Sequence, residues 1–199
     1  MEYLVYILLI VTSVVGLTFI VERGLALRWK KVIPQEIESA IENCQSKNDL
    51  EKVQRACEKN VSPLGRLIST AIERLSWPKE EAVDALQTRA RHEIVKLERG
   101  LVVLEIIVGI APLLGLVGTI IGMMATFEHV GAMGLNDASK LAQGISVILK
   151  ATLIGLLIAI PALVSWSYYT KKVEMLAVEM ETLCDEFIRR QYREEKAKK

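Results

Sequence analysis

Three long apolar runs alternate with charged segments along the chain. They lie at about residues 3–21, 101–127 and 144–169. An α-helix needs roughly 20 apolar residues to cross the hydrocarbon of a bilayer, and each run approaches or exceeds that length. Backbone polar groups in lipid must be satisfied within their own segment, so we predict that each run is a transmembrane helix.

The charged segments set the predicted organisation and orientation. We expect transmembrane helices at 1–22, 101–128 and 141–170, with a cytosolic helical region at 23–100, a periplasmic turn at 129–140 and a cytosolic C-terminal helix and tail at 171–199. Lysines follow the first run (Lys30, Lys31) and the third (Lys171, Lys172). By the positive-inside rule, these ends face the cytoplasm and the N-terminus faces the periplasm. The expected fold class is all-α.

Helical spacing continues from the soluble region into the second apolar run. Apolar side chains recur at Leu86, Ala90, Leu97 and Leu101. We therefore predict one helix over 79–127, roughly 70 Å long. The pair Ser62-Pro63 predicts the start of an earlier helix. At the other end of the chain, we expect residues 189–199 to form a solvated charged tail.

Composition excludes several classes of function. The chain has 199 residues, of which 51% are hydrophobic and 25% charged, and its net charge is +1. The sequence contains no basic patch with interleaved aromatic residues, so nothing in it indicates nucleic-acid binding. The three cysteines are an odd, scattered set that predicts reduced thiols. The two histidines are too far apart to suggest a metal cluster, and we expect neither a metal nor a cofactor.

Small residues form a stripe on each of the two later runs. The first stripe includes Pro112, Gly115, Thr119 and Gly122, and the second includes Thr152, Gly155 and Ala159. Small residues allow helices to approach closely, and threonine hydroxyls can bond across helices or to ions and water. Two interpretations stay open: plain helix packing, which is common in membranes, and a polar path.

The predicted hydrocarbon spans of these two helices contain no acidic residue. Glu105 and Glu128 fall at the edges of the second span. A proton relay normally requires a titratable group inside the membrane. If the chain conducts protons, another subunit must therefore supply the carboxylate. Lys150 is the one charge in the third run; it either extends to the outer interface or pairs with a neighbouring subunit or partner.

Two motifs at matched membrane depth, residues 111–122 and 144–161, together with the soluble segment 61–66, resemble a known family. The chain is similar to the MotA/TolQ/ExbB proton channel family, and in particular to its three-crossing ExbB/TolQ branch. The number and order of the predicted crossings agree with this branch.

The resemblance implies a ring-shaped homopentamer in the lipid of the bacterial inner membrane. It also implies two copies of a single-crossing ExbD/TolR-like subunit, whose membrane aspartate supplies the missing carboxylate. Such a complex uses the proton-motive force to do work on the cell envelope.

The resemblance also assigns roles to residues on the two stripes. The two path threonines of the family correspond to Thr119 and Thr152. Pro112, Gly115, Gly122, Gly155 and Ala159 would line the pore. Lys150 is unusual against the pattern of the family, and we keep it as a candidate polar modulator of the pore. Relatives often carry a glutamate where this chain has Val147, which leaves the partner's aspartate as the carrier.

Other classes of function remain as alternatives. A non-conducting scaffold that presents long cytosolic helices is the main one. A self-sufficient transporter is disfavoured by three crossings without a buried carboxylate. An enzyme is disfavoured because the sequence shows no nucleophile–base arrangement or phosphate loop. The choice between protons and sodium, and the envelope process that is driven, stay open.

Overall fold

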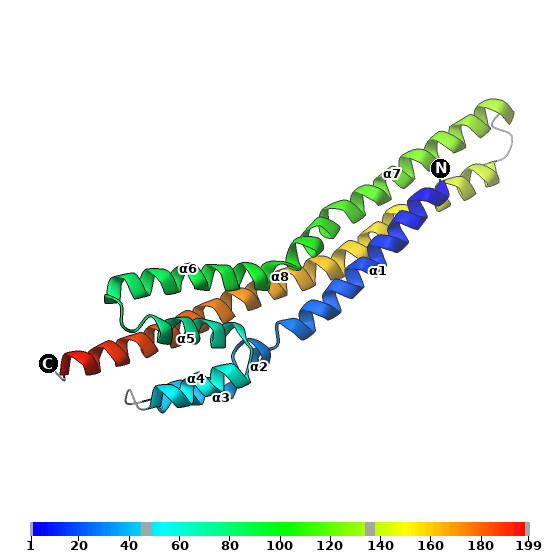
Figure 1. The fold of residues 1–199 in the computed structure, drawn as a ribbon. Coiled ribbons are helices and arrows are strands. Elements are labelled where there is room, and N and C mark those ends of the chain that lie inside the picture. Colours follow the sequence, from blue (N-terminus) through cyan, green and yellow to red (C-terminus); the bar gives the residue numbers. More distant parts are fainter. Residues whose placement is uncertain (1, 45–48, 134–137, 198–199) are drawn as a thin grey trace. The chain divides into compact units, whose positions relative to one another are not determined.

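The computed structural model describes residues 2–44, 49–133 and 138–197, and the regular structure within these ranges is entirely helical. The described residues form α1 (Glu2–Ala26), α2 (Trp29–Val32), α3 (Gln35–Glu42), α4 (Leu50–Lys59), α5 (Pro63–Glu73), α6 (Lys79–Glu98), α7 (Leu101–Met133) and α8 (Ala138–Ala197) (Figure 1). The prediction of an all-α fold is confirmed for this part of the chain.

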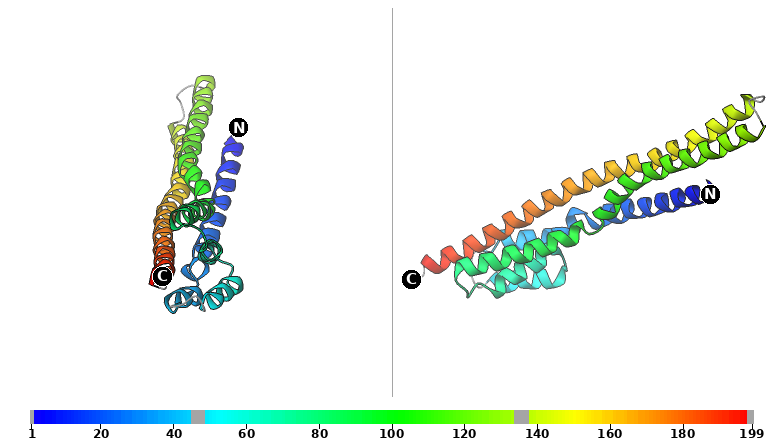
Figure 2. Two further views of the ribbon diagram at one scale, coloured as in Figure 1. Left: turned by 60° about the vertical axis from the view of Figure 1, so that its left-hand side comes forward. Right: turned by 90° about the horizontal axis from the view of Figure 1, so that it is seen from above.

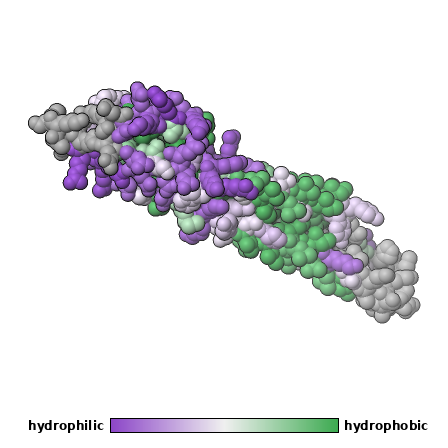
Figure 3. All heavy atoms as spheres, turned by 90° about the horizontal axis from the view of Figure 1, so that it is seen from below, coloured by the Kyte–Doolittle hydropathy of each residue, from purple (hydrophilic) through white to green (hydrophobic). Residues whose placement is uncertain are grey.

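The helices divide into two compact units. The first comprises Met1–Arg23 and Gly100–Tyr168, and the second comprises Gly24–Arg99 and Tyr169–Lys199. Hydrophobic residues dominate the visible surface of the first unit, whereas hydrophilic side chains cover most of the second (Figure 3).

The first unit contains three helices that are long and apolar enough to cross a membrane. The candidate spans are Tyr3–Ala26, Leu101–Glu128 and a part of Gly144–Arg193. Within this unit, α7 and the first part of α8 run side by side in every view, with α1 against them (Figures 1 and 2). Large apolar side chains point outward, including Leu113 and Leu157, which are 60% and 61% exposed. Exposed apolar surface of this extent is typical of lipid or subunit contact.

The second unit has an apolar core built from its short helices and the C-terminal part of α8. Ser62 caps α5 as predicted, because its hydroxyl accepts a hydrogen bond from the Gly65 amide at 3.0 Å, with Pro63 in the first turn. Side chains that are at most 1% exposed form the centre of the core: Leu27, Val32, Ile33, Ile37, Ile41, Leu64, Leu67, Ile68, Leu176, Met180 and Phe187.

The end of α8 is not a solvated tail, so that prediction is wrong for residues 190–192. Arg190 donates to the carbonyl of Glu42 at 3.0 Å, and the Tyr192 hydroxyl donates to the carbonyl of Trp77 at 2.8 Å. Gln191 between them is buried. The charged composition of this segment suggested exposure to solvent. Long polar side chains can instead donate to backbone carbonyls at helix ends and loops, as they do here.

The prediction of one helix over 79–127 is also wrong, because the chain turns at Arg99 and Gly100 between α6 and α7. Glycine is the poorest helix former apart from proline. A side chain at Gly100 would also clash with the guanidinium of Arg23, which lies against this turn. The apolar spacing of Leu97 and Leu101 continues across the turn, which is why the pattern did not reveal it.

The predicted turn at 129–140 is shorter in the structure. Helix α7 extends to Met133 and α8 begins at Ala138. Gly134 and Asn136, which we expected to break the helix, and Asp137, which we expected to cap the next one, lie outside the described residues. Gly131 does not end α7, because one glycine costs a helix only about 1 kcal/mol relative to alanine.

Candidate functional site

The backbones of α7 and α8 come closest at two glycines. A β-carbon on Gly155 would lie 2.6 Å from the carbonyl oxygen of Ala111, and one on Gly115 would lie 3.0 Å from that of Ala151. The first distance is shorter than real β-carbons show, and the second is so tight that the facing backbone would have to shift. Glycine at these positions therefore allows the two helices to touch along their main chains.

Both predicted path threonines lie at this contact. The hydroxyl of Thr152 on α8 lies 3.5 Å from the carbonyl oxygen of Gly115 on α7. Thr119 follows Gly115 by one helical turn, is only 9% exposed, and donates its hydroxyl proton to the carbonyl of Leu116 at 2.7 Å. The structure thus places the two threonines within about one turn of each other along the helix pair.

The two hydroxyls differ in what they can offer to a ligand. Thr119 uses its proton within its own helix, so its oxygen remains an acceptor. The bond from Thr152 is longer than the usual 2.5–3.0 Å between oxygens and is therefore weak. Its hydroxyl can rotate at little cost, either to donate to water or a carboxylate or to accept from them.

The other small residues of the two stripes pack within the chain. A β-carbon on Gly122 would lie 2.6 Å from Cγ1 of Ile148. Ala159 is buried in a cluster with Ile107, Ala111 and Ala162, and Pro112 is half-buried. These contacts support the packing interpretation of the stripes. That Pro112, Gly115, Gly122, Gly155 and Ala159 also line a pore stays a prediction.

A groove of about 220 Å³ adjoins the same contact on the side of α1. Tyr6 from α1, Thr126 from α7 and Gly144 from α8 are among its lining residues. The hydroxyl of Thr126 donates to the carbonyl of Gly122 at 2.9 Å, so it is satisfied within α7. Lys150 is exposed on α8, outside this groove and outside the threonine contact.

Residues 59–182 match the model of the MotA/TolQ/ExbB proton channel family. The match covers more than half of the chain and includes both threonines and all the glycines of the α7–α8 contact. The chain belongs to this family.

Individual relatives place this family member in the ExbB/TolQ branch. It is 29% identical over 198 residues to the Tol-Pal system protein TolQ of Pseudomonas aeruginosa, a match that covers 92% of this chain and 84% of TolQ. It is 28% identical over 116 residues to the biopolymer transport protein ExbB of Aquifex aeolicus, covering 58% of this chain and 78% of that protein.

A third match is to a biopolymer transport protein ExbB homologue of Methanothermobacter thermautotrophicus, with 34% identity over 142 residues. This match covers 71% of the present chain but only half of the archaeal protein.

Sequence reasoning missed a buried ion cluster in the second unit of this ExbB/TolQ-type chain. The Glu93 carboxylate on α6 is 0% exposed and accepts hydrogen bonds from Arg66 Nε at 2.9 Å and Lys96 Nζ at 2.8 Å. Burial acts to raise the pKa of Glu93, but the bonds and charges of Arg66 and Lys96 outweigh it and hold that pKa below its ordinary value.

One signal in the sequence could have revealed Glu93. It occupies a position in the apolar stripe of α6, between Ala90 and Leu97, where a charge needs a partner. The partner, Arg66, comes from α5 and is 27 residues away in sequence. No local pattern links the two positions.

Proposed function

We propose that this chain is the channel subunit of an energy-transducing complex in the bacterial inner membrane. Family membership supports this function, as do the names of its relatives: biopolymer transport protein ExbB and Tol-Pal system protein TolQ. The single observation that carries the proposal is the pair of threonine hydroxyls at the glycine contact of α7 and α8. Between Glu105 and Glu128, the sequence of α7 around Thr119 contains no acidic residue.

In the proposed complex, five copies of the chain surround two copies of a single-crossing ExbD/TolR-like subunit. The partner's membrane aspartate carries the proton, because the inner parts of α7 and α8 provide no carboxylate. The membrane potential supplies about 2.3 kcal/mol per charge at 100 mV, so several ions would drive each working step on the envelope.

The two threonines have complementary roles in this mechanism. The oxygen of Thr119 accepts a hydrogen bond from water or from the protonated aspartate. The weakly held hydroxyl of Thr152 turns to donate to the aspartate when it is charged. Together they stabilise both protonation states without themselves carrying charge, which keeps the aspartate mobile.

A second candidate, a non-conducting membrane scaffold, is favoured by the contacts within one chain. Gly115, Gly122 and Gly155 all serve the packing of α7 against α8, and this role requires no ion flow. The two candidates differ in whether the threonine hydroxyls are needed once the helices are packed.

Replacement of Thr152 by valine separates these possibilities. Valine preserves the shape of the side chain but removes the hydroxyl, whose bond to Gly115 is too long to contribute much to packing. We expect the Thr152→Val protein to assemble with its partner normally but to lose most proton uptake into liposomes. Thr18→Val is the matched control, because Thr18 is exposed on α1 and bonds only within its own helix.

Equal proton uptake by the wild type and the Thr152→Val protein would argue strongly against Thr152 as a path residue. No uptake by the wild-type complex under any ion gradient would favour the scaffold instead.

A further inference from the structure

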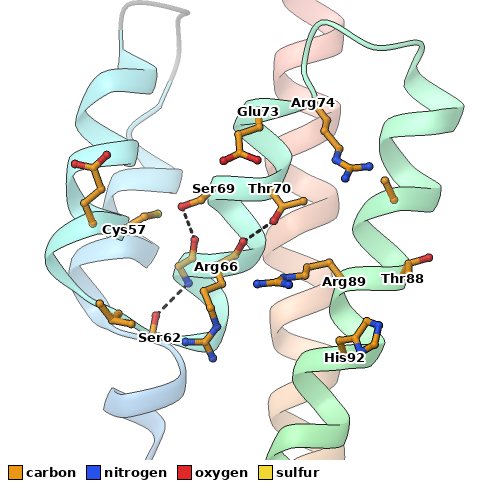
Figure 4. Close-up of a pocket in the computed structure, with 14 residues that line it drawn as sticks. Cys57, Ser62, Arg66, Ser69, Thr70, Glu73, Arg74, Thr88, Arg89 and His92 are labelled. Atoms are coloured by element: carbon orange, nitrogen blue, oxygen red, sulfur yellow. Dashed lines mark hydrogen bonds between the residues drawn. The ribbon is translucent and has the colours of Figure 1, made fainter.

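A cleft of about 550 Å³ lies in the second unit between α5 and α6, near the end of α4. Polar and charged side chains supply much of its lining. Figure 4 shows Arg66 on α5, Arg74 just after the end of α5, and Arg89 and His92 on α6, around this space. The cleft is separate from the α7–α8 contact, and the proposed ion path makes no use of it.

Arg89 is the unusual residue of the cleft. It extends from α6 toward α5 and ends beside Arg66 (Figure 4). Its Nε is buried and has no hydrogen-bond partner among the described residues. Its Nη2 lies 3.8 Å from Glu93, which is beyond hydrogen-bond length. The Arg89 side chain as a whole is 42% exposed and lines the cleft, so the outer part of its guanidinium is accessible to a ligand there.

The charges around Arg89 favour an anion at this end of the cleft. Arg66, Lys96 and Arg89 surround one carboxylate, that of Glu93, and this leaves two positive charges uncompensated. Glu58 and Glu73 also line the cleft, as does the positive Arg74. Glu73 follows Arg66 by seven residues on α5, about 10 Å further along the helix. The opposite charges are therefore spread along the cleft and do not simply cancel.

We propose that this cleft binds a phosphate-bearing compound, with its phosphate oxygens on Arg89 and the rest of the molecule toward Glu73. A planar guanidinium can bind two phosphate oxygens at once through its two Nη groups. The cleft is large enough for more than a bare phosphate ion. The phosphate belongs either to a soluble compound or to a lipid head group, which offer the same oxygens.

Inorganic pyrophosphate is a suitable probe for the purified full-length protein in detergent. We expect it to raise the thermal unfolding midpoint in a saturable way, against a chloride control of equal ionic strength. The test variant is Thr88→Glu, which places a negative charge in the lining of the cleft at an exposed helix position. The matched control is Gln87→Glu, the same charge change at the adjacent exposed residue, which does not line this cleft.

We expect Thr88→Glu to weaken pyrophosphate binding about tenfold or more, while Gln87→Glu changes it by less than about twofold. Arg89→Gln should have at least the effect of Thr88→Glu. Equal weakening by Thr88→Glu and Gln87→Glu would show a general charge effect and overturn the proposal, as would a midpoint that does not respond to pyrophosphate. Because Thr88 and Gln87 are exposed, a folding defect does not obscure the comparison of these two variants.

Reconstitution distinguishes the two sources of phosphate. Vesicles of phosphatidylcholine, with or without phosphatidylglycerol, are titrated with pyrophosphate. Competition by phosphatidylglycerol would indicate a lipid head group, and unchanged binding would indicate a soluble compound. Proton uptake by the Thr88→Glu protein reports separately on the proposed channel function, which does not depend on this cleft.

Discussion

At the scale of single residues, the buried carboxylate of Glu93 joins α5 to α6. It is fully buried, yet its pKa is lowered, because the hydrogen bonds and charges of Arg66 and Lys96 more than offset the cost of burial. A group whose pKa is lower in the folded state binds a proton more readily in the unfolded state. Its contribution to stability is therefore complete above the ordinary pKa and is lost as the pH falls toward the lowered value.

We predict that replacing Glu93 with glutamine lowers the stability of the protein near neutral pH by about 2–3 kcal/mol, because Arg66 and Lys96 lose the negative charge and one of the two acceptor oxygens. The difference between the wild type and the variant should shrink as the pH falls below about 4.5, the ordinary pKa of glutamate. Thermal unfolding in detergent across this range measures it. Glu98→Gln, an exposed acid on the same helix, should change little; a pH-independent difference for Glu93→Gln would contradict the assigned ionisation.

The cysteines show how burial acts on single residues of another type. All three are buried thiols that form no disulfide with one another. Burial raises the pKa of the Cys57 thiol to about 11, even though a hydrogen bond with Ser69 lowers it slightly. The thiol is therefore protonated and unreactive near neutral pH, which agrees with the expectation of reduced cysteines.

At the scale of helices, the contact of α7 with α8 depends on glycine where backbone meets backbone. Gly155 faces the carbonyl of Ala111, which cannot move without the helix. Gly109 on α7 is different, because a β-carbon there would have nothing within 4 Å. The two glycines therefore differ in role: the contact of α7 with α8 requires glycine at position 155 and does not require it at position 109.

We predict that Gly155→Ala destabilises the protein by about 1–3 kcal/mol, because the new methyl group pushes α7 and α8 apart. Gly109→Ala should be neutral or stabilising, since alanine is the better helix former by about 1 kcal/mol. Thermal unfolding of the two variants, compared with the wild type in one detergent, tests this difference. If both variants were destabilised to a similar extent, the close approach of the two backbones at Gly155 would not be what requires glycine there.

At the scale of the whole molecule, the membrane helices provide hydroxyl groups and close packing but no acid. Glu105 and Glu128 lie near the two ends of the second candidate span and are exposed, so neither is placed at the threonine contact. A single chain of this composition lacks the titratable group that a proton path normally requires. If the protein conducts protons as we propose, conduction must depend on assembly.

We predict that the purified chain alone carries no protons across liposome membranes. Co-reconstitution with an ExbD/TolR-like subunit should produce proton uptake, and a partner with asparagine in place of its membrane aspartate should not. Dye-based proton flux at a fixed membrane potential is the measurement. Substantial flux through the chain alone would require a carrier group that we have not identified.

The sequence by itself determined the features that depend on local order and length. Apolar runs long enough to cross a bilayer predicted three helices of that kind, and the Ser62-Pro63 pair predicted the start of α5; both are present. The motifs around Thr119 and Thr152 indicated the family, which the comparison with known proteins confirmed. These features can be recognised in the sequence because helix periodicity, capping and the length of an apolar run depend on residues that are close together in the chain.

Only the tertiary structure decided the features that join distant segments. Arg23 packs at the turn by Gly100, Arg66 pairs with Glu93, and Arg190 caps carbonyls of α3, and each pair is separated by many residues. From the sequence alone, such side chains are expected to be solvated. Their partners are distant in sequence and can be identified only once folding brings the two together. The α7–α8 contact is similar: the sequence showed small residues, and the fold showed which of them touch backbone.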